Sequence, residues 1–405
     1  MEKCIIYIGE FDMRNENVQA HLVKNNGRIF TSLGYKVVYI GVNREKNSFK
    51  EIQTLPPIAT DENCLYYELP NSLNAAGVLK CGIVCRYILH IFSVLREKYD
   101  IAYIISYQSP TYAIAIKKIA IWCRKKCVKY IVNCADLPIF ELQSPFKKFV
   151  MKVNWKFLHR WNKKYADGVI SVSRFIDDFY YKKGRSSVIV PPLFDSDNFV
   201  FSTQPNEITT FIYAGLPFVI TNREASPKGM KDRLDKIIDL FLTLSGTGVP
   251  YVFKVIGISK EDYLAGVPRH TNALKNEKQI RFLGKFNHEE TLSAVAAADF
   301  SINYRDENLM TKAGFSTKIV ESVSLGTPVV INPIGDTFCY LETGVSGFAL
   351  CENSNANVDL LRQLCEKNAD ERWQMKRKCY EKHTFSTEAY KCDIQNFLNS
   401  LRKEI

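Results

Sequence analysis

A glycine-rich loop followed by a helix, within residues 313–328, holds the residues whose types and spacing best fit chemistry. Gly314, Ser316 and Thr317 precede the helix, which ends at Gly326, and a buried strand follows. The free N–H groups and positive dipole end of such a helix attract anions. Glu321, further along the helix, offers an acceptor-only carboxylate that can hold a diol such as a ribose. The stretch therefore suits a nucleoside diphosphate. Its alternative is an ordinary crossover helix with a solvated glutamate.

The same stretch resembles the signature of glycosyltransferase family 4 and its relatives. That signature reads Glu-Gly-Phe, then small residues, then a second Glu, then Gly-Thr-Pro-Val-Val, and it is matched here by Gly314, Phe315, Glu321 and residues 326–330. The sequence of residues 314–322 is similar to that of bacterial family members that assemble polysaccharides. The resemblance implies that the loop of Gly314, Phe315, Ser316 and Thr317 faces the donor sugar and diphosphate, and that Glu321 binds the nucleotide ribose.

The chain departs from the signature at Ala313, where the family has its first glutamate. In the family that residue approaches the transferred sugar, so the identity of the donor and the activity itself both depend on this position. Arg305, eight residues earlier, is a candidate to place a positive charge near the diphosphate instead. The alternative is a surface arginine that follows a strand.

Two lysines resemble the cations with which the family neutralises the leaving diphosphate. Lys231 is the better match and Lys228 is the second. Both lysines follow the predicted strand that ends at Ala214-Gly215. Gly215 is predicted to belong to the same donor site. The arginine expected just after Gly215 is Leu216. Either lysine could also be a solvated residue at a helix end.

The resemblance implies a GT-B enzyme that retains anomeric configuration and uses lysine, arginine and helix N-termini in place of a metal. We expect no metal and no cofactor other than the nucleotide-sugar donor, because the sequence has no Asp-x-Asp at a strand end. On the acceptor side, Asp136 follows a buried strand, where α/β folds place ligand-facing groups. A loop or cap role is its alternative. Gly9, His21 and Arg28, in or near the first loop, are further acceptor-side candidates.

Short β-branched or aromatic runs alternate with helical patterns along the chain and must position these residues. The predicted strands of the first half are 5–8, 37–41, 101–106, 130–133 and 168–172. Those of the second half are 210–214, 251–256, 280–283, 300–304, 328–331 and 347–350. This alternation is typical of parallel sheets. The predicted fold is α/β, of the GT-B class, with two Rossmann-like domains facing each other across a cleft.

The predicted domain boundary lies near residue 195, where a Pro-Pro pair and a polar stretch follow a short apolar run. Residues 1–195 form the predicted acceptor domain and residues 196–385 the predicted donor domain. Residues 386–405 form a C-terminal helix that can pack back on the first domain. Ser144 before Pro145, and either Asn287 or His288 before Glu289-Glu290, are predicted helix N-caps.

One predicted helix is strongly basic, in a chain of 405 residues with a net charge of +11. No acidic residue lies between Glu141 and Asp167. Its basic residues include Lys147, Lys148, Lys152, Lys156 and Arg160, followed by Lys163 and Lys164. Its apolar residues recur at helical spacing: Phe146, Phe149, Val150, Val153, Phe157 and Trp161. This pattern is typical of an interfacial helix on anionic lipid. A core-packed crossover helix with a solvated basic face is the alternative.

Composition indicates an ordinary globular protein, with 46% hydrophobic and 24% charged residues. We expect no secretion signal and no transmembrane helix. The 12 cysteines are scattered and form no Cys-x-x-Cys, which favours reduced thiols in a cytoplasmic protein. The expected location is the cytoplasm, with peripheral attachment to the inner face of the cytoplasmic membrane.

The predicted function is retaining transfer of a sugar from a nucleotide-sugar to a lipid-linked glycan acceptor, in capsule, O-antigen or exopolysaccharide synthesis. Nucleic acid is not expected as a partner, because no nucleic-acid-binding module accompanies the charge. Two alternatives remain. Ala313 and Leu216 are compatible with a non-catalytic homologue that binds a partner or a glycan. A GT-B epimerase would need carboxylate and histidine acid/base groups, of which the sequence shows no obvious set.

Overall fold

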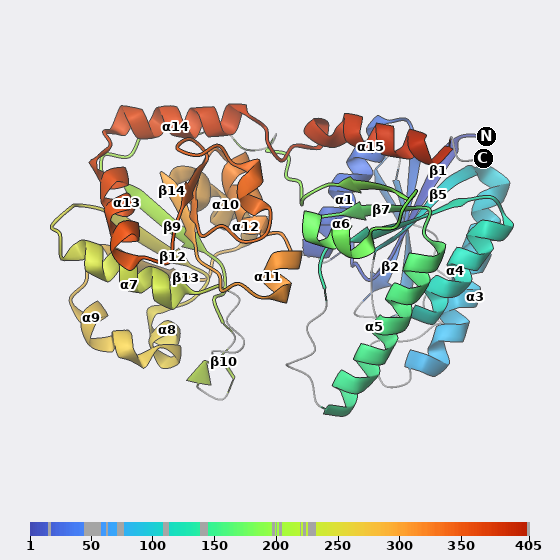
Figure 1. The fold of residues 1–405 in the computed structure, drawn as a ribbon, viewed down its shortest axis with the longest axis horizontal. Coiled ribbons are helices and arrows are strands. Elements are labelled where there is room, and N and C mark those ends of the chain that lie inside the picture. Colours follow the sequence, from blue (N-terminus) through green and yellow to red (C-terminus); the bar gives the residue numbers. More distant parts are fainter. Residues whose placement is uncertain are drawn as a thin grey trace. The chain divides into compact units, whose positions relative to one another are not determined.

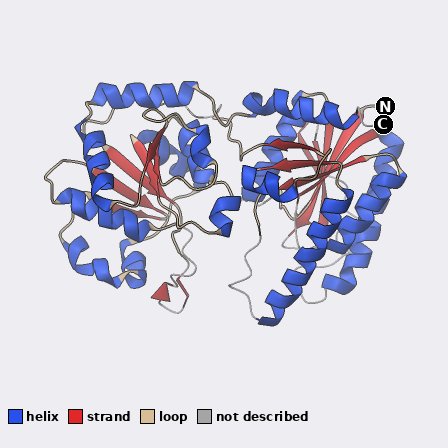
Figure 2. Cartoon of the chain, viewed as in Figure 1, coloured by secondary structure: helices blue, strands red, loops and turns tan. Residues whose placement is uncertain are grey.

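The computed structural model divides the chain into two compact units, Met1–Leu193 with Thr387–Ile405, and Phe194–Ser386. The described residues are 1–14, 18–43, 58–61, 64–70, 77–107, 113–137, 145–196, 199, 201, 205–218, 220–221, 224–225 and 232–402. Each unit is a sheet flanked by helices (Figures 1 and 2).

The first unit holds an eight-stranded sheet in the order β3-β4-β2-β1-β5-β6-β7-β8. Its strands are β1 (Lys3–Ile8), β2 (Lys36–Asn43), β3 (Ile58–Asp61), β4 (Cys64–Pro70), β5 (Asp100–Tyr107), β6 (Lys129–Cys134), β7 (Gly168–Ser171) and β8 (Ser186–Ile189). Every pairing is parallel except that of β3 with β4. The helices are α1 (Val18–Ser32), α3 (Gly77–Lys98), α4 (Ala113–Lys125), α5 (Pro145–Tyr165), α6 (Arg174–Tyr180) and α15 (Thr387–Arg402).

The second unit holds a six-stranded, fully parallel sheet in the order β13-β12-β9-β14-β15-β16. Its strands are β9 (Thr210–Ala214), β12 (Val252–Ile256), β13 (Ile280–Gly284), β14 (Phe300–Asn303), β15 (Val329–Ile331) and β16 (Gly347–Ala349), and β10 (Ile220–Thr221) pairs with β11 (Glu224–Ala225) apart from it. The helices are α7 (Leu234–Ser245), α8 (Lys260–Gly266), α9 (Thr271–Lys275), α10 (His288–Ala297), α11 (Leu309–Ala313), α12 (Thr317–Ser324), α13 (Ser354–Glu366) and α14 (Ala369–Glu381).

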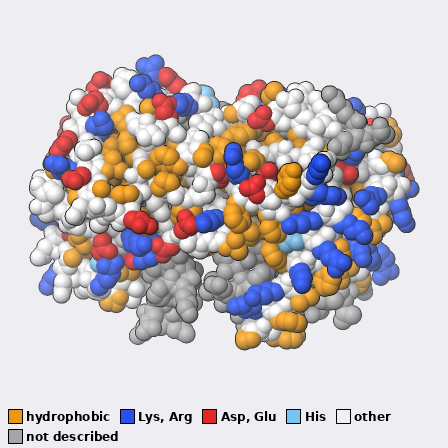
Figure 3. Space-filling view, viewed as in Figure 1, with side chains coloured by type: hydrophobic (Ala, Val, Ile, Leu, Met, Phe, Trp, Pro, Cys, Tyr) orange, Lys and Arg blue, Asp and Glu red, His pale blue; other side chains and the backbone are white. Residues whose placement is uncertain are grey.

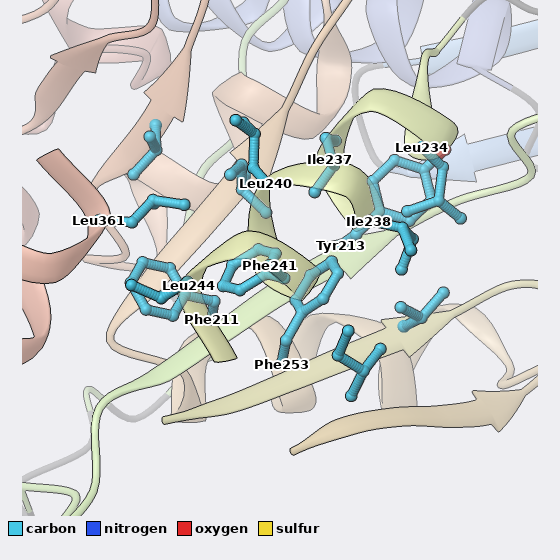
Figure 4. Close-up of a cluster of buried hydrophobic side chains, with 14 of the residues drawn as sticks. Phe211, Tyr213, Leu234, Ile237, Ile238, Leu240, Phe241, Leu244, Phe253 and Leu361 are labelled. Atoms are coloured by element: carbon cyan, nitrogen blue, oxygen red, sulfur yellow. The ribbon is translucent and has the colours of Figure 1, made fainter. Parts of the chain in front are cut away.

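The core of the second unit forms where α7 packs on its sheet (Figure 4). Helix α7 buries Leu234, Ile237, Ile238, Phe241 and Leu244, a three- and four-residue spacing that places them on one face. The Phe241 ring stacks on Phe253 of β12, with centroids 4.1 Å apart. This apolar face fixes the start of α7, and with it the residues just before the helix, against the sheet.

All the strands expected from the sequence are present, with ends that differ by at most two residues. Strands β3, β4, β8, β10 and β11 were not predicted. β8 consists of Ser-Ser-Val-Ile and is followed closely by Pro191-Pro192, so its sequence reads as linker although it pairs with β7. The predicted cap of α10 is confirmed: the Asn287 side chain accepts from the backbone N–H of Glu290, whose side chain accepts from the N–H of Asn287. The predicted cap at Ser144 lies outside the described residues.

The described part of the chain contains no helix both long enough and apolar enough to cross a membrane. No disulfide bond joins the cysteines whose side chains are described. The C-terminal helix α15 belongs to the first unit, where its Phe397 and Leu401 pack over Gly168 of β7.

Candidate functional site

A cavity of about 430 Å³ lies in the second unit at the carboxyl ends of its central strands. Strands β9, β12 and β14 end at the cavity with Ala214, Ile256 and Asn303. Gly215 and Gly257, which come directly after β9 and β12, also line it. The chain order reverses at β9, because β12 lies on one side of it and β14 on the other. Ligands of open α/β sheets bind at such a switch point. Helix α12 closes the cavity with Thr317, Lys318, Glu321 and Ser322.

Gly215 and Gly257 make room for the cavity and for the side chain of Lys318. Both have positive φ angles, +146° and +110°, which side-chain-bearing residues rarely adopt. A Cβ on Gly215 would overlap Nζ of Lys318, and a Cβ on Gly257 would overlap the Gly215 carbonyl oxygen. The Gly215 N–H donates to Ile256 O over 2.9 Å, and the Gly257 N–H to Gly284 O over 2.7 Å. The ends of the three strands are thereby held together around the site.

The loop before α12 follows the predicted pattern, but its residues take different directions. Thr317 lines the cavity. Phe315 packs edge-on against Tyr340 and Phe385, with ring centroids 5.4 and 5.7 Å away, and so anchors the loop. Ser316 is the N-cap residue of α12 without a side-chain capping bond, and its buried Oγ has no partner among the described residues. Gly314 ends α11, donating its N–H to Met310 O over 2.9 Å.

A buried carboxylate at the edge of the cavity gathers two cations and a phenol. Asp232 accepts from Nε of Arg305 over 2.8 Å, from Nζ of Lys318 and from the Tyr213 hydroxyl over 3.1 Å. The Lys318 ammonium also lies 4.6 Å from the centre of the Tyr213 ring. Burial alone would raise the pKa of Asp232, but the charges and hydrogen bonds of Lys318 and Arg305 outweigh it and lower that pKa to about 2. Asp232 is therefore ionised at every physiological pH.

Glu321 faces the same cavity in a different electrostatic state. Burial raises the pKa of its carboxyl to about 7, and the nearby charge of Lys318 offsets only part of that effect. Lys318 and Glu321 are three residues apart on α12, so they lie on neighbouring parts of one helix face. The cavity thus holds a cation and a weakly acidic carboxyl side by side.

Arg305 follows β14 but is not among the residues that line the cavity. Its backbone N–H donates to Oδ1 of Asn332 over 3.0 Å, and its carbonyl accepts from Nδ2 of Asn332 over 2.8 Å. Its guanidinium is engaged by Asp232, which makes it a support for the charged cluster. A direct contact of Arg305 with the donor stays a prediction.

The two departures from the family signature have structural counterparts. Ala313 is completely buried, so the position of the family's first glutamate holds a small packed residue. Leu216 lines the cavity with about half of its surface exposed, where the resemblance leads one to expect an arginine. Lys228 and Lys231, the lysines predicted to bind the diphosphate, lie outside the described residues.

The acceptor-side candidates belong to the first unit. Gly9 donates its N–H to Ile40 O over 3.1 Å, and its Cα lies so close to Tyr107 that a Cβ would clash. Asp136 is exposed just after β6, and its charge is one of the causes that raise the pKa of Tyr107, after burial. His21 and Arg28 lie on α1, and Arg28 is exposed. Their roles stay predictions.

Sequence reasoning did not single out Lys318, Asp232 or Asn303. Lys318 lies in the matched stretch, three residues before Glu321, and this spacing was the available signal. Asn303 lines the cavity, and its buried Nδ2 has no hydrogen-bond partner within the described part of the chain. The pairing of Asp232 with residues 73 and 86 positions away leaves no local pattern. Among the described side chains, no group of three His, Cys, Asp or Glu residues could hold a metal ion.

Comparison with known protein families places this site. Residues 213–382 match the family described as "Glycosyl transferases group 1". We call these matched residues the group 1 domain. The group 1 domain spans strands β9 to β16, and it therefore contains the whole cavity and the Asp232 cluster. A search of curated proteins gives no match.

Solved structures of GT-B glycosyltransferases share the fold of the chain. Anabaena HepE in complex with UDP is 16% identical, with a TM-score of 0.63 over 98% of this chain and 100% of that one. The catalytic domain of starch synthase IV from Arabidopsis thaliana, bound to ADP and acarbose, is 10% identical, with a TM-score of 0.65 over 98% and 99%. Sucrose-phosphate synthase from Thermosynechococcus elongatus is 13% identical, with a TM-score of 0.61 over 100% of both chains. The prediction of two Rossmann-like units of the GT-B class is confirmed.

Proposed function

We propose that this chain is a glycosyltransferase that moves a sugar, with retention of configuration, from a nucleotide-sugar to a lipid-linked glycan. The observation that carries the proposal is the cavity at the switch point of the group 1 domain, where the start of α12, Lys318 and Glu321 meet. The helix start and the ammonium suit a diphosphate, and the carboxyl suits a ribose diol.

The donor is proposed to be a nucleoside diphosphate sugar. Solved structures of two proteins of the same fold hold UDP and ADP, respectively, which supports this choice of ligand class. As the glycosidic bond breaks, negative charge grows on the leaving diphosphate, and preorganised N–H groups and cations stabilise it. In this proposal those groups take the place of a metal ion. Retention follows from the resemblance to glycosyltransferase family 4.

The lipid-linked acceptor is proposed on the strength of helix α5. Five apolar side chains at helical spacing are exposed on it: Phe146, Phe149, Val150, Val153 and Phe157. Phe146 and Phe149 expose 80% and 67% of their surface, which favours an interfacial helix over one packed into the core. The helix is held on the unit through its C-terminal half, where Leu158 and Asn162 are buried and the Lys117 ammonium lies 5.1 Å from the centre of the Trp161 ring.

Basic side chains accompany this apolar surface. Lys152, Lys156 and Arg160 are exposed on α5, whereas the side chain of Lys147 lies outside the described residues. Hydrophobic and basic surface adjoin along this helix in Figure 3. An apolar stripe flanked by cations binds anionic lipid. We therefore propose that the enzyme works at the inner face of the cytoplasmic membrane, in the assembly of a bacterial surface polysaccharide.

A panel of nucleotide sugars tests the donor assignment by thermal stabilisation, because a ligand that binds only the folded state raises the melting temperature. At a free ligand concentration of about 100 times Kd, the free energy of unfolding increases by about 2.7 kcal/mol. The matching donor should then release its nucleoside diphosphate when membrane lipid extracts are added. A non-catalytic homologue is the second candidate function, because Ala313 and Leu216 stand where the family has a glutamate and an arginine. Binding without turnover against such acceptors would favour it, and a panel without any stabilisation would contradict the donor site itself.

A further inference from the structure

Among the described residues, the first loop beside the cavity of the group 1 domain begins without a cation. Leu216 occupies that place, just after β9. Of the described residues that line the cavity, Lys285 and Lys318 are the ones that carry positive charge. Lys285 is largely exposed after β13. Lys318 instead reaches from α12 across to β9, so that its ammonium lies directly against Gly215, the residue before Leu216.

Lys318 is held in this place by a carboxylate that has a second cation of its own. Asp232 is 3% exposed and binds Nε of Arg305 through Oδ1, while Lys318 binds Oδ2. Removing the only partner of a buried charge is costly. Because Arg305 and the Tyr213 hydroxyl stay on Asp232, Lys318 can turn toward a ligand without leaving that carboxylate unpaired.

We propose that Lys318 is the cation that binds the leaving diphosphate in this chain, in the place that a residue at position 216 would fill. This inference rests on the proposed function. In the reaction, the bond from the sugar C1 to the phosphate oxygen breaks and its electron pair stays on that oxygen. The acceptor oxygen forms the new bond to C1, and its proton passes to the leaving phosphate. Lys318 stabilises the charge that this step places on the diphosphate.

Two features of the site agree with this assignment. The Lys318 side chain is 24% exposed and so partly desolvated, and in such surroundings a charge-assisted hydrogen bond is stronger than in water. It also lies one residue after the first residue of α12, so the ammonium and the N–H groups of the helix start act on the same anion. A lysine and a helix start together form a phosphate site without a metal.

The test compares a nucleoside diphosphate with its own nucleoside. UDP, ADP, GDP and dTDP are titrated into the wild-type protein by calorimetry, and the tightest is kept. Its nucleoside is titrated by ligand-observed NMR. Lys318→Met should lower the affinity for the diphosphate about ten- to a hundredfold relative to the wild type. Its affinity for the nucleoside should stay within about threefold of the wild-type value. Lys318→Arg, which keeps the charge, should recover most of the diphosphate affinity.

The matched control is Lys312→Met, on α11, whose lysine pairs with Glu307 away from the cavity. It should bind both ligands as the wild type does. The inference is overturned if Lys318→Met binds the diphosphate normally, if it loses nucleoside and diphosphate equally, or if Lys231→Met alone shows the selective loss. Wild-type protein that binds none of the four diphosphates would contradict the proposed function instead. Melting curves of every variant identify any that fails to fold.

Discussion

Nε of Arg305 lies 2.8 Å from Oδ1 of Asp232, and this pair joins the end of β14 to the start of α7. Asp232 immediately precedes Arg233 and α7, whose apolar face packs on the sheet. Packing thereby fixes the carboxylate, and the carboxylate positions the two cations that meet on it. The charged wall of the cavity is thus a consequence of how α7, β14 and α12 are packed together.

Asp232→Asn should destabilise the group 1 domain by roughly 2 kcal/mol at pH 7, because Lys318 and Arg305 would face each other without a counter-charge. In the wild type the pKa of Asp232 is lowered to about 2. A lowered pKa stabilises the fold above the unfolded value near 3.8, and this stabilisation is lost as the pH falls through about 2. Melting temperatures of the two proteins should therefore converge between pH 4 and pH 2. A constant difference would contradict the ion-pair account.

Glu321→Gln should show the opposite pH dependence. Burial raises the pKa of Glu321 to about 7, so the protonated form suits the folded state. The wild type should lose stability relative to the glutamine variant as the pH rises from about 4.5 to above 7, by up to roughly 3 kcal/mol. Calorimetric melting at pH 5 and pH 8 measures this change. Parallel curves would mean that Glu321 is better solvated than the structure indicates.

The same variant tests the role of Glu321 toward a ribose. If the carboxylate accepts the two ribose hydroxyls, Glu321→Gln should weaken nucleoside diphosphate binding about tenfold at pH 8. The difference should shrink at pH 6, where much of the wild-type carboxyl is protonated. Calorimetric titrations at the two pH values give the comparison. Equal affinities of both proteins at pH 8 would remove Glu321 from the ribose site.

Gly215→Ala should impair both the fold and the site. Its φ of +146° strains any side chain, and the new Cβ would overlap the Lys318 ammonium. We expect a loss of roughly 1–3 kcal/mol in stability and a weaker affinity for nucleoside diphosphates. The control is Gly82→Ala on α3, where a Cβ meets no atom within 4 Å and the helix favours alanine. That variant should melt at or slightly above the wild-type temperature. Unchanged diphosphate binding by Gly215→Ala would contradict the close approach of Lys318.

Phe146→Ser combined with Phe149→Ser should abolish most binding to vesicles, because each buried phenylalanine contributes about 1.5–3 kcal/mol. Flotation with vesicles that contain or lack anionic lipid measures this binding.

Lys152→Gln with Lys156→Gln should lower binding to anionic vesicles roughly thirtyfold, because each lysine contributes about 1 kcal/mol near an anionic surface. Tyr181→Ser, which removes an exposed aromatic from another part of the first unit, is the control. If wild-type protein floats with neither lipid composition, α5 is not a membrane helix.

The sequence by itself determined the fold class and the loop that leads into α12. Runs such as Thr210–Ala214 and Phe300–Asn303 are buried strands whatever their neighbours are, since their apolar residues have no other way to leave water. The capping box at Asn287 is equally local, because its partners lie three residues apart. Gly314, Thr317 and Glu321 were found in this way, because they lie within eight residues of one loop and the helix that follows it.

Only the tertiary structure decided which side chains share the site. Lys318 meets Asp232 across 86 positions of chain, and Arg305 meets it across 73, because β9 and β14 are neighbours in the sheet. Phe315 matched the signature, yet its ring packs on Tyr340 and Phe385. Strand order, and therefore the composition of a site at the strand ends, depends on which helices pack on which face. The packing of helices on each face depends on contacts throughout the core, so no single segment of the sequence determines it.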